Sequence, residues 1–400
     1  MTQENSPRRT AKEAQDPYNR YYMRVSGMYR AAKWGMLLLF ILYLLLTLFI
    51  RRDSITYENL LYLMRDLNIS SDGGSFASAV YEEQQNMTFC AFKNELALAG
   101  SSGVRLYDGS GACVLDDSTS YKAPALESGE KYLLLYDAGG NDYALFTTLA
   151  CVHRASADGA IQYADISDSG RYLIVSRTEE TKYKVTLYSA SFTELARYYR
   201  DSFVTSAAIS PNGEAVAILS ADASGWTLNG SVTLCSDGSA ETKNVSLGTS
   251  LPVAARYFSD GSLAVICDDR VVFLTPSGGI AASVSYEQQT LQCFDLSDTC
   301  VAFACKRNVL GSESRIVLLD TKGSVLCDEV RTGKIESVSA SDVSPAVYIV
   351  SGSSVEKLSR GASERTEFSG NLRAVREVGG CAVLCYSSGA QALLANAAEN

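Results

Sequence analysis

Short apolar runs alternate with clusters of Gly, Ser, Asn and Asp along most of the chain after residue 75. The clearest example is AAISPNGEAVAIL, residues 207–219, in which two apolar runs flank a polar tetrapeptide. Ser210-Pro211-Asn212-Gly213 has Ser first, Pro second and Gly fourth, which is the residue order of a type I turn. Because small and β-branched residues suit a pleated, buried surface, this stretch predicts two strands joined by a tight turn.

The same pattern recurs at a regular interval. Related turns are found at Leu126–Gly129, Ile166–Gly170, Ile209–Gly213 and Phe258–Gly261, with glycines 41, 43 and 48 residues apart. A second apolar strand, followed by its own turn, recurs 39 to 47 residues apart at Tyr107, Phe146, Tyr188, Cys235, Leu274, Leu319 and Leu358. A period near 40–45 residues with about four strands per unit is typical of the blades of a β-propeller.

The number of units decides how the ring closes. Seven complete units run from about residue 86 to residue 369, and residues 371–396 supply three strands of an eighth. The separate run 75–83 can supply the missing strand, which would close the ring and remove exposed sheet edges. The sequence therefore predicts an all-β, eight-bladed β-propeller over residues 75–400, closed by pairing of 75–83 with the C-terminal blade. Seven blades is the alternative.

The fourth unit is longer than the others. Its strands are expected at 204–210, 214–220, 230–236 and 241–247, which leaves residues 221–229 as an inserted loop over the blade edge. Trp226 lies in this insertion. Because binding residues are often on loops and exposed Trp is common at interfaces, Trp226 is the candidate binding residue.

Residues 34–50, WGMLLLFILYLLLTLFI, form the longest uncharged apolar run. At about 1.5 Å per residue, a helix of this length spans roughly 25 Å, enough to cross a bilayer if the flanking charges reach the interfaces. Trp34, Lys33, Arg51 and Arg52 are the predicted anchor residues. A cleaved signal peptide is the competing interpretation, but Arg51-Arg52-Asp53 follows the run in place of a small-residue cleavage site.

Charge on either side of this run predicts the orientation. Residues 1–33 carry seven Lys/Arg against three acidic residues, which makes them a basic tail. Because Lys and Arg are retained on the cytoplasmic side, we expect a single-pass protein of the cell membrane with its N-terminus inside and its propeller outside.

Residues 51–74 connect the anchor to the propeller. ITYENLLYLMRDLNI, residues 55–69, places Leu60, Leu61, Met64 and Leu67 on one face of a helix. This pattern predicts a juxtamembrane amphipathic helix that packs on the propeller or along the membrane. A partner-binding helix is the alternative.

Residues 53–400 carry 26 basic and 42 acidic residues, an acidic balance that argues against binding nucleic acid. No zinc, calcium, P-loop or nucleophile-elbow motif is found, so we expect no metal, no cofactor and no enzyme activity. His153, the one histidine, is expected at a surface or strand-edge position. Asp165, Asp168 and Asp260 are expected to support turns, and Asp268-Asp269 to lie in a solvated connection.

The 11 cysteines are scattered and contain no C-x-x-C pair, which is a poor disulfide framework. Cys267, Cys305 and Cys385 end strand-like runs where the fourth unit has Leu219. They are expected to be small packing residues. Free thiols outside the cell would be unusual in an oxidising setting, so they indicate an anaerobic source or argue against this topology.

The order of a basic tail, a single anchor, the ITYENLLYLMRDLNI helix and a degenerate propeller resembles an uncharacterised family, grouped as a domain of unknown function. Its members are membrane-anchored propeller proteins of anaerobic Gram-positive bacteria. The most particular segment runs from Glu58-Asn59-Leu60 to Arg65-Asp66. The resemblance covers essentially the whole chain and implies a cell-envelope location, which would make free cysteines unsurprising. It brings no catalytic residues.

Two functions remain open. The first is a non-catalytic, membrane-anchored extracytoplasmic propeller that binds or scaffolds a cell-envelope protein or polymer. The second is an envelope hydrolase or lyase with its site at the propeller axis. Convergent carboxylates of perturbed pKa at the axis would favour the enzyme. A broad apolar or aromatic patch on one face would favour the binding protein.

Overall fold

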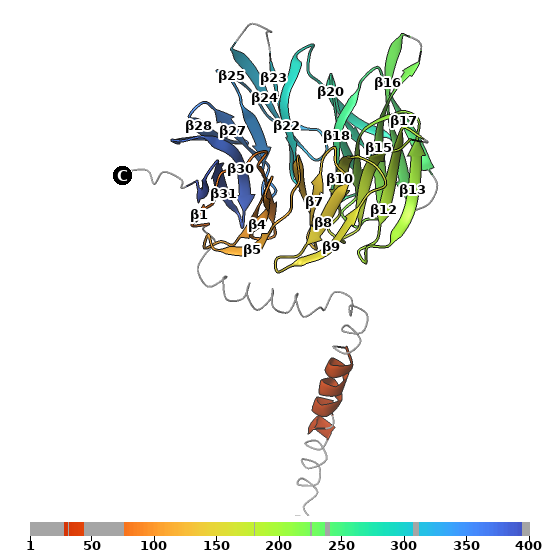
Figure 1. The fold of residues 1–400 in the computed structure, drawn as a ribbon, viewed down its shortest axis with the longest axis vertical. Coiled ribbons are helices and arrows are strands. Elements are labelled where there is room, and N and C mark those ends of the chain that lie inside the picture. Colours follow the sequence, from red (N-terminus) through yellow and green to blue (C-terminus); the bar gives the residue numbers. More distant parts are fainter. Residues whose placement is uncertain are drawn as a thin grey trace, which may run out of the picture. The chain divides into compact units, whose positions relative to one another are not determined.

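The computed structural model describes residues 28–30, 32–43, 76–179, 181–224, 226–236, 241–306 and 312–393 (Figure 1). The chain divides into two compact units, Met1–Ser71 and Asp72–Asn400. In the first unit, residues 28–30 and 32–43 are helical and exposed. Residues 44–50 of the expected anchor and the expected helix at 55–69 lie outside the described residues. Over the described ranges, no helix is both long and apolar enough to cross a membrane.

The second unit is an eight-bladed β-propeller, and each blade is a four-stranded antiparallel sheet (Figure 1). The strands of blades 1 and 2 are β2 (Thr88–Phe92), β3 (Glu95–Gly100), β4 (Gly103–Tyr107), β5 (Cys113–Asp117), β6 (Pro124–Ser128), β7 (Leu133–Asp137), β8 (Asp142–Phe146) and β9 (Cys151–Ser156). Those of blades 3 and 4 are β10 (Ile161–Ile166), β11 (Tyr172–Arg177), β12 (Tyr183–Tyr188), β13 (Glu194–Arg200), β14 (Phe203–Ile209), β15 (Ala215–Ser224), β16 (Thr227–Ser236) and β17 (Glu241–Gly248).

The remaining blades continue the same order from the axis outward. The strands of blades 5 and 6 are β18 (Pro252–Tyr257), β19 (Leu263–Cys267), β20 (Arg270–Leu274), β21 (Ile280–Ser285), β22 (Thr290–Leu296), β23 (Cys300–Lys306), β24 (Glu313–Asp320) and β25 (Val325–Thr332). Those of blades 7 and 8 are β26 (Ser337–Ala340), β27 (Ala346–Ser351), β28 (Ser354–Ser359), β29 (Ala362–Glu367), β30 (Leu372–Val378), β31 (Cys381–Tyr386), β32 (Gly389–Ala392) and β1 (Ser78–Val80). The prediction of eight blades is confirmed, and the seven-bladed alternative is wrong.

Blade 8 joins the two ends of the propeller. Its strand order is β30-β31-β32-β1, and β1 pairs with β32 antiparallel from Ser78↔Gln391 to Val80↔Gly389. The Tyr81 hydroxyl lies 2.9 Å from the Tyr386 carbonyl oxygen and 2.7 Å from the Gly389 carbonyl oxygen, so it donates to this pair of acceptors. The two strands of the closing ladder therefore come from opposite ends of the propeller sequence.

The recurring turn is a structural device in blades 3, 4 and 5. The Gly213 N–H donates to the Ser210 carbonyl oxygen at 2.7 Å, and Gly213 has a φ of 76°, which favours glycine. The copy at Leu126–Gly129 differs, because Gly129 directly follows β6 and lies against blade 3. A Cβ at Gly129 would stand 2.4 Å from the Ser167 carbonyl oxygen, so this glycine serves a close approach between blades.

The insertion in blade 4 is not an edge loop, as the sequence had suggested. β15 and β16 pair without a break from Ala215↔Ser236 to Ser224↔Thr227, so residues 221–229 extend both strands into a projecting hairpin (Figure 1). Ladder hydrogen bonds satisfy the backbone of the extension, which an open loop would leave to water.

All 11 cysteines lie in the described part of the chain, and no disulfide bond joins any two of them. Cys267, Cys305 and Cys385 are buried in the clusters between blades, as the sequence predicted.

Candidate functional site

One position in the innermost strand of every blade directs its side chain toward the next blade, close to the axis. The register of the strand pairs shows which residues are equivalent from blade to blade. In every blade, the residue at this position pairs with a residue of the second strand that packs against the following blade. In blade order the eight residues are Cys90, Glu127, Asp165, Ala208, Arg256, Asp295, Ser339 and Arg376. We call this set the axial ring. Innermost strands lie nearest the axis of a propeller, so the ring brings charges together from blades far apart in the sequence.

Two aspartates of the axial ring join neighbouring blades in the same way. Asp165 Oδ1 accepts the Ile166 N–H at 2.8 Å, and its Oδ2 accepts the Ile209 N–H of blade 4 at 2.9 Å. Asp295 in blade 6 repeats the arrangement, with Oδ1 accepting from Leu296 and Oδ2 from Ala340 of blade 7. The expectation that Asp165 supports a turn is therefore wrong. Asp165 lies in β10 and bridges two blades.

The arginines of the ring also connect blades. Arg376 Nε donates to the Phe89 carbonyl oxygen of blade 1 at 2.9 Å, and Nη1 donates to Ser339 Oγ of blade 7 at 3.3 Å. Arg256 Nη2 lies 2.7 Å from Asp298 Oδ1, an ion pair between blades 5 and 6. Half-buried charges at the axis are thus largely held by partners on the adjoining blades.

Glu127 differs from the ring aspartates. It is half-buried next to Asp165 at the seam between blades 2 and 3. Burial raises the pKa of the Glu127 carboxyl well above its usual range, and the Asp165 carboxylate raises that pKa further. Burial likewise raises the pKa of Asp165, although the backbone hydrogen bond from Ile209 opposes the change. A carboxyl group of raised pKa beside a second carboxyl is a group that can exchange a proton near neutral pH.

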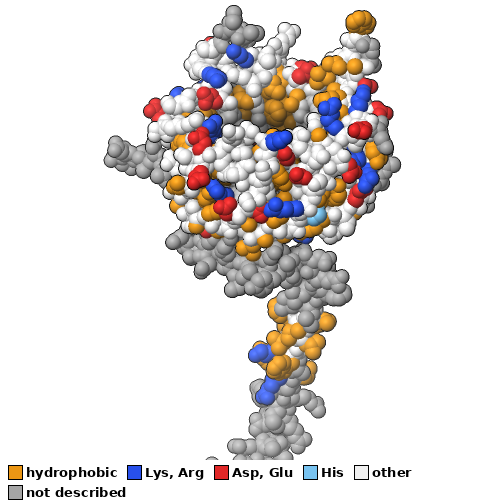
Figure 2. Space-filling model, viewed as in Figure 1, with side chains coloured by type: hydrophobic (Ala, Val, Ile, Leu, Met, Phe, Trp, Pro, Cys, Tyr) orange, Lys and Arg blue, Asp and Glu red, His pale blue; other side chains and the backbone are white. Residues whose placement is uncertain are grey.

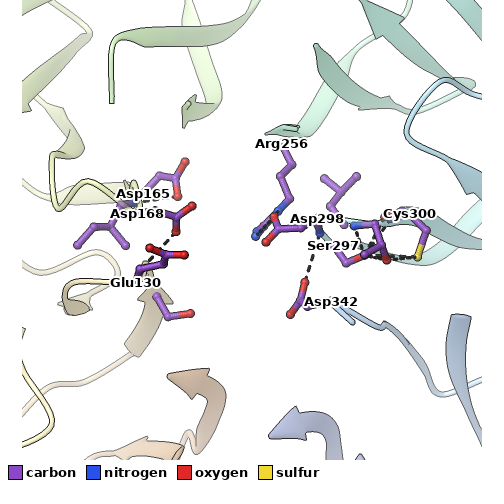
Figure 3. A network of polar contacts seen from close by, with 12 residues as sticks. Glu130, Asp165, Asp168, Arg256, Ser297, Asp298, Cys300 and Asp342 are labelled. Atoms are coloured by element: carbon purple, nitrogen blue, oxygen red, sulfur yellow. Dashed lines mark hydrogen bonds and ion pairs between the residues drawn. The ribbon is translucent and has the colours of Figure 1, made fainter. Parts of the chain in front are cut away.

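A second set of carboxyl groups surrounds the axis at the turns that follow the innermost strands. We call Glu130, Asp168, Asp298 and Asp342 the turn carboxylates. Asp168 Oδ1 accepts the Glu130 N–H at 3.2 Å, and Asp342 Oδ1 accepts the Asp298 N–H at 3.3 Å. Figure 3 shows Glu130 and Asp168 facing Asp298 and Asp342 across the centre of the ring.

The turn aspartates differ in what they support. Asp168 bonds across blades rather than within its own turn, so its expected role is wrong in that detail. Burial and Asp298 raise the pKa of Asp168. Asp260 does support its own turn, as expected, because its Oδ1 accepts the Ser262 N–H at 2.9 Å. Asp268 Oδ1 accepts the Leu251 N–H at 2.8 Å, and Asp269 is exposed in the same connection.

The ring offers few groups for other chemistry. Burial raises the pKa of the Cys90 thiol to about 11, which suppresses the reactive thiolate. Over the described ranges, no three His, Cys, Asp or Glu side chains are placed to hold a metal ion together. His153 lies in the outermost strand β9 with its ring stacked 4.6 Å from that of Phe192, a strand-edge position as expected. Burial lowers the pKa of His153.

An apolar patch lies at the opposite ends of the strands. Five large side chains are exposed at strand ends in and beside blade 4. They are Tyr199 at the end of β13 (49%), Phe203 at the start of β14 (56%), Trp226 at the β15–β16 tip (104%), Leu228 at the start of β16 (51%) and Val253 at the start of β18 (41%). Because adjacent strands are antiparallel, all five ends lie on the same face of the propeller, away from the turn carboxylates. We call these residues the blade 4 patch. Figure 2 shows hydrophobic side chains along and below the projecting hairpin at the upper right.

The sequence identified part of this picture. It singled out Trp226, which the structure places at the fully exposed tip of the hairpin. Lys33 and Trp34 are exposed on the N-terminal helix, and Arg51 and Arg52 lie outside the described residues. Glu127, Arg256, Asp295 and Arg376 were missed. A signal for them was present in the sequence. If the repeats are aligned on the turn after each innermost strand, the position two or three residues before that turn carries an acidic residue in some blades and an arginine in others.

Comparisons with known proteins agree with the fold. The model of DUF5711, a family of unknown function, matches residues 75–377. Among curated proteins, no sequence matches the chain. The resemblance to a family of unknown function is confirmed, whereas its membrane anchoring and bacterial source stay predictions.

Solved propeller structures are similar to this chain at low identity. A eukaryotic initiation factor is 13% identical with a TM-score of 0.53, over 78% of this chain and 89% of that one. Chaetomium thermophilum Sqt1 bound to the N-terminus of the ribosomal protein L10 is 11% identical with a TM-score of 0.53, over 80% and 100%. The Cps50 (Swd1) propeller domain of Myceliophteria thermophila is 10% identical with a TM-score of 0.50, over 68% and 94%. At such identities the likeness establishes the fold alone.

Proposed function

The chain belongs to DUF5711, a family of unknown function, and on that premise we propose that it is a non-catalytic scaffold that binds a protein partner through the blade 4 patch. The observation that carries this proposal is the exposure of Tyr199, Phe203, Trp226 and Leu228 on one face, with Trp226 at 104%. Exposed aromatic side chains that gather on one face are characteristic of protein-binding surfaces.

The shape of the hairpin supports the same function. β15 and β16 are each ten residues long, whereas the third strands of the neighbouring blades have five or six residues. A paired hairpin presents Trp226 on a rigid support, which lowers the conformational entropy lost when a partner binds. One similar propeller, Sqt1, was solved with the N-terminus of a ribosomal protein bound.

We place this scaffold outside the cell membrane. The uncharged run 34–50 between Lys33 and Arg51-Arg52, together with the basic tail, supports a single-pass anchor with the N-terminus in the cytoplasm. The protein partner is then a component of the cell envelope. A reporter fused to the C-terminus should be active only outside the cytoplasm, and activity confined to the cytoplasm would refute this placement.

The binding proposal is tested by site-specific photo-crosslinking in intact cells that express the full chain. A photoreactive residue at position 226 or 203 should give one discrete adduct, whereas position 259, exposed in a turn on the opposite face, should give none. Trp226→Ala should reduce the adduct formed from position 203 at least about tenfold, as expected for a central aromatic contact. Equal adducts from positions 226 and 259 would refute the assignment of the face.

The axial ring supports a second candidate, a hydrolase or lyase of the cell envelope. Glu127 and Asp165 converge and both have a raised pKa, which is a feature of acid–base pairs. We rank it second because Asp165 and Asp295 each accept two backbone hydrogen bonds that hold blades together. Turnover of a wall fragment by the purified chain, abolished in Glu127→Gln, would reverse this order.

A further inference from the structure

A polar groove of about 440 Å³ lies between blades 1 and 2, away from the axial ring and from the blade 4 patch. The connection from β5 to β6 forms one wall with Ser118, Thr119 and Tyr121. The start of β8 and the end of β9 form the other wall with Asp142, Arg154 and Ser156. The volume is within the range of about 300–1,000 Å³ that is usual for small-ligand sites.

The one cation that lines the groove is already paired. Arg154 forms an ion pair with Asp117, and its Nε lies 3.3 Å from Cys151 Sγ. Asp142 Oδ1 accepts the Ser156 hydroxyl at 2.6 Å. Since Asp117 balances the one cation and Asp142 adds a negative charge, the groove disfavours an anionic ligand such as a phosphate.

The polar groups that remain are suited to hydroxyl groups. Thr119 Oγ1 is buried without a hydrogen-bond partner in the described structure, an arrangement that is unfavourable unless a bound group satisfies it. Burial, with Asp142 as the next cause, raises the pKa of Tyr121 to about 12, so its phenol stays protonated and can donate. The groove therefore combines a carboxylate acceptor, a guanidinium donor and hydroxyls that do both.

The walls offer little apolar surface. Tyr121 and Tyr143 line the groove but are only 8% and 3% exposed. An apolar ligand or a hydrophobic side chain of a peptide would bury almost no apolar area there, and would lose its hydrophobic driving force. The groove thus selects a ligand that is neutral, small and rich in hydroxyl groups.

We propose that the groove between blades 1 and 2 is a binding site for a neutral saccharide, held by Thr119, Tyr121, Asp142 and Arg154. Asp142 and Arg154 bind hydroxyl groups on the two sides of a sugar ring, and Thr119 gains its missing partner. The site does not depend on the blade 4 patch, so either proposal can fail without the other.

The test measures binding of maltotriose, cellotriose and tri-N-acetylchitotriose to the full chain by titration calorimetry. The chain is kept in a zwitterionic detergent, because glucoside and maltoside detergents would compete. One trisaccharide should bind with a Kd of about 1 mM or tighter, an affinity within reach of a few hydrogen bonds. Asp142→Ala should weaken that binding at least about tenfold, and Thr119→Val, which keeps the side-chain shape, should weaken it about threefold or more.

Asp116→Ala is the matched control. Asp116 lies on the neighbouring strand β5 and pairs with Arg105 outside the groove, so its removal should leave saccharide binding unchanged. Melting curves of all variants identify any that fail to fold. Absence of binding by all three trisaccharides at about 10 mM would overturn the proposal. Binding that survives both Asp142→Ala and Thr119→Val, or that is displaced by inorganic phosphate, would overturn it as well.

Discussion

The axial ring and the blade 4 patch differ from the other repeats in different ways. At the ring, the strands pair alike in every blade and only the side chain changes. At the patch, two strands are longer than their equivalents in the neighbouring blades. Asp165, Asp295 and Arg376 each bond to the backbone of another blade. Trp226 and Phe203 instead expose 104% and 56% of their surface. Residues of the ring therefore contribute to holding the blades together, and residues of the patch are available to a partner. Substitutions should separate these roles.

The largest effect should come from a change outside both regions, in the blade that closes the propeller. Deleting residues 75–83 removes β1 and the buried Tyr81, which leaves β32 as an open edge in blade 8. The melting temperature of the full chain should fall by more than about 10 °C, since an entire closing ladder is lost. Tyr81→Phe is the control, because it removes only the hydroxyl bonds to Tyr386 and Gly389 and should cost a few degrees at most. An unchanged transition after the deletion would contradict the role of the closing strand.

A smaller loss is expected when one inter-blade bond is removed. Asp165→Ala leaves the N–H groups of Ile166 and Ile209 without their acceptor and should lower the free energy of unfolding by about 2–4 kcal/mol. Asp295→Ala should cost a similar amount, because its two bonds are equivalent. Asp260→Ala, in an exposed turn, is the control and should cost under about 1 kcal/mol. Denaturant unfolding measures the free energy of unfolding of all three variants. If all three lost the same amount, the bonds between blades would be no more important for stability than the bonds within a turn.

The pH dependence of stability sharpens the description of the ring. The folded state raises the pKa of Glu127 above its ordinary value of about 4.3, so the folded chain binds that proton more tightly than the unfolded chain. Stability linked to Glu127 is therefore fully present in acid and is lost as the pH rises from the ordinary carboxyl range toward neutrality and above. The melting temperature of the wild type should fall by roughly 2–5 °C more than that of Glu127→Gln between pH 5 and pH 8. Parallel curves would show that Glu127 is not perturbed.

The smallest effect on stability is expected at the patch. Trp226→Ala and Leu228→Ser remove side chains that are 104% and 51% exposed, so each should change the free energy of unfolding by less than about 0.5 kcal/mol. Replacing residues 222–229 by an Asn-Gly turn should likewise leave the melting temperature within about 2 °C, because Ala221↔Gly230 and the rest of the β15–β16 ladder keep their pairing. A large loss from either change would mean that the hairpin is a structural part of the ring rather than a docking surface.

Local sequence was sufficient to predict the blades and their number. A β-turn signal such as Ser210–Gly213 depends only on neighbouring residues, and the repeat period counts the units without any knowledge of contacts. Burial of Cys267 and Cys305 also followed from the apolar runs in which they lie. The sequence misplaced the segment 221–229, because extra ladder pairs need a partner strand whose register is set across the hairpin.

The candidate sites depended on residues far apart in the chain. Asp165 looked like a turn residue because its bond to Ile209 lies 44 positions away, and Glu127 carried no signal of a perturbed carboxyl group. The groove at Thr119 and Asp142 likewise joins the β5–β6 connection to strands β8 and β9, which no local pattern relates.

The sequence by itself determined the repeat, the number of blades and an exposed Trp226, because turn chemistry and strand periodicity act over a few residues. Only the tertiary structure decided which polar side chains meet at the axis, which bridge the blades, and where the insertion carries Trp226. Those outcomes depend on the closure of the ring, which fixes distances and burial between residues that the chain keeps far apart.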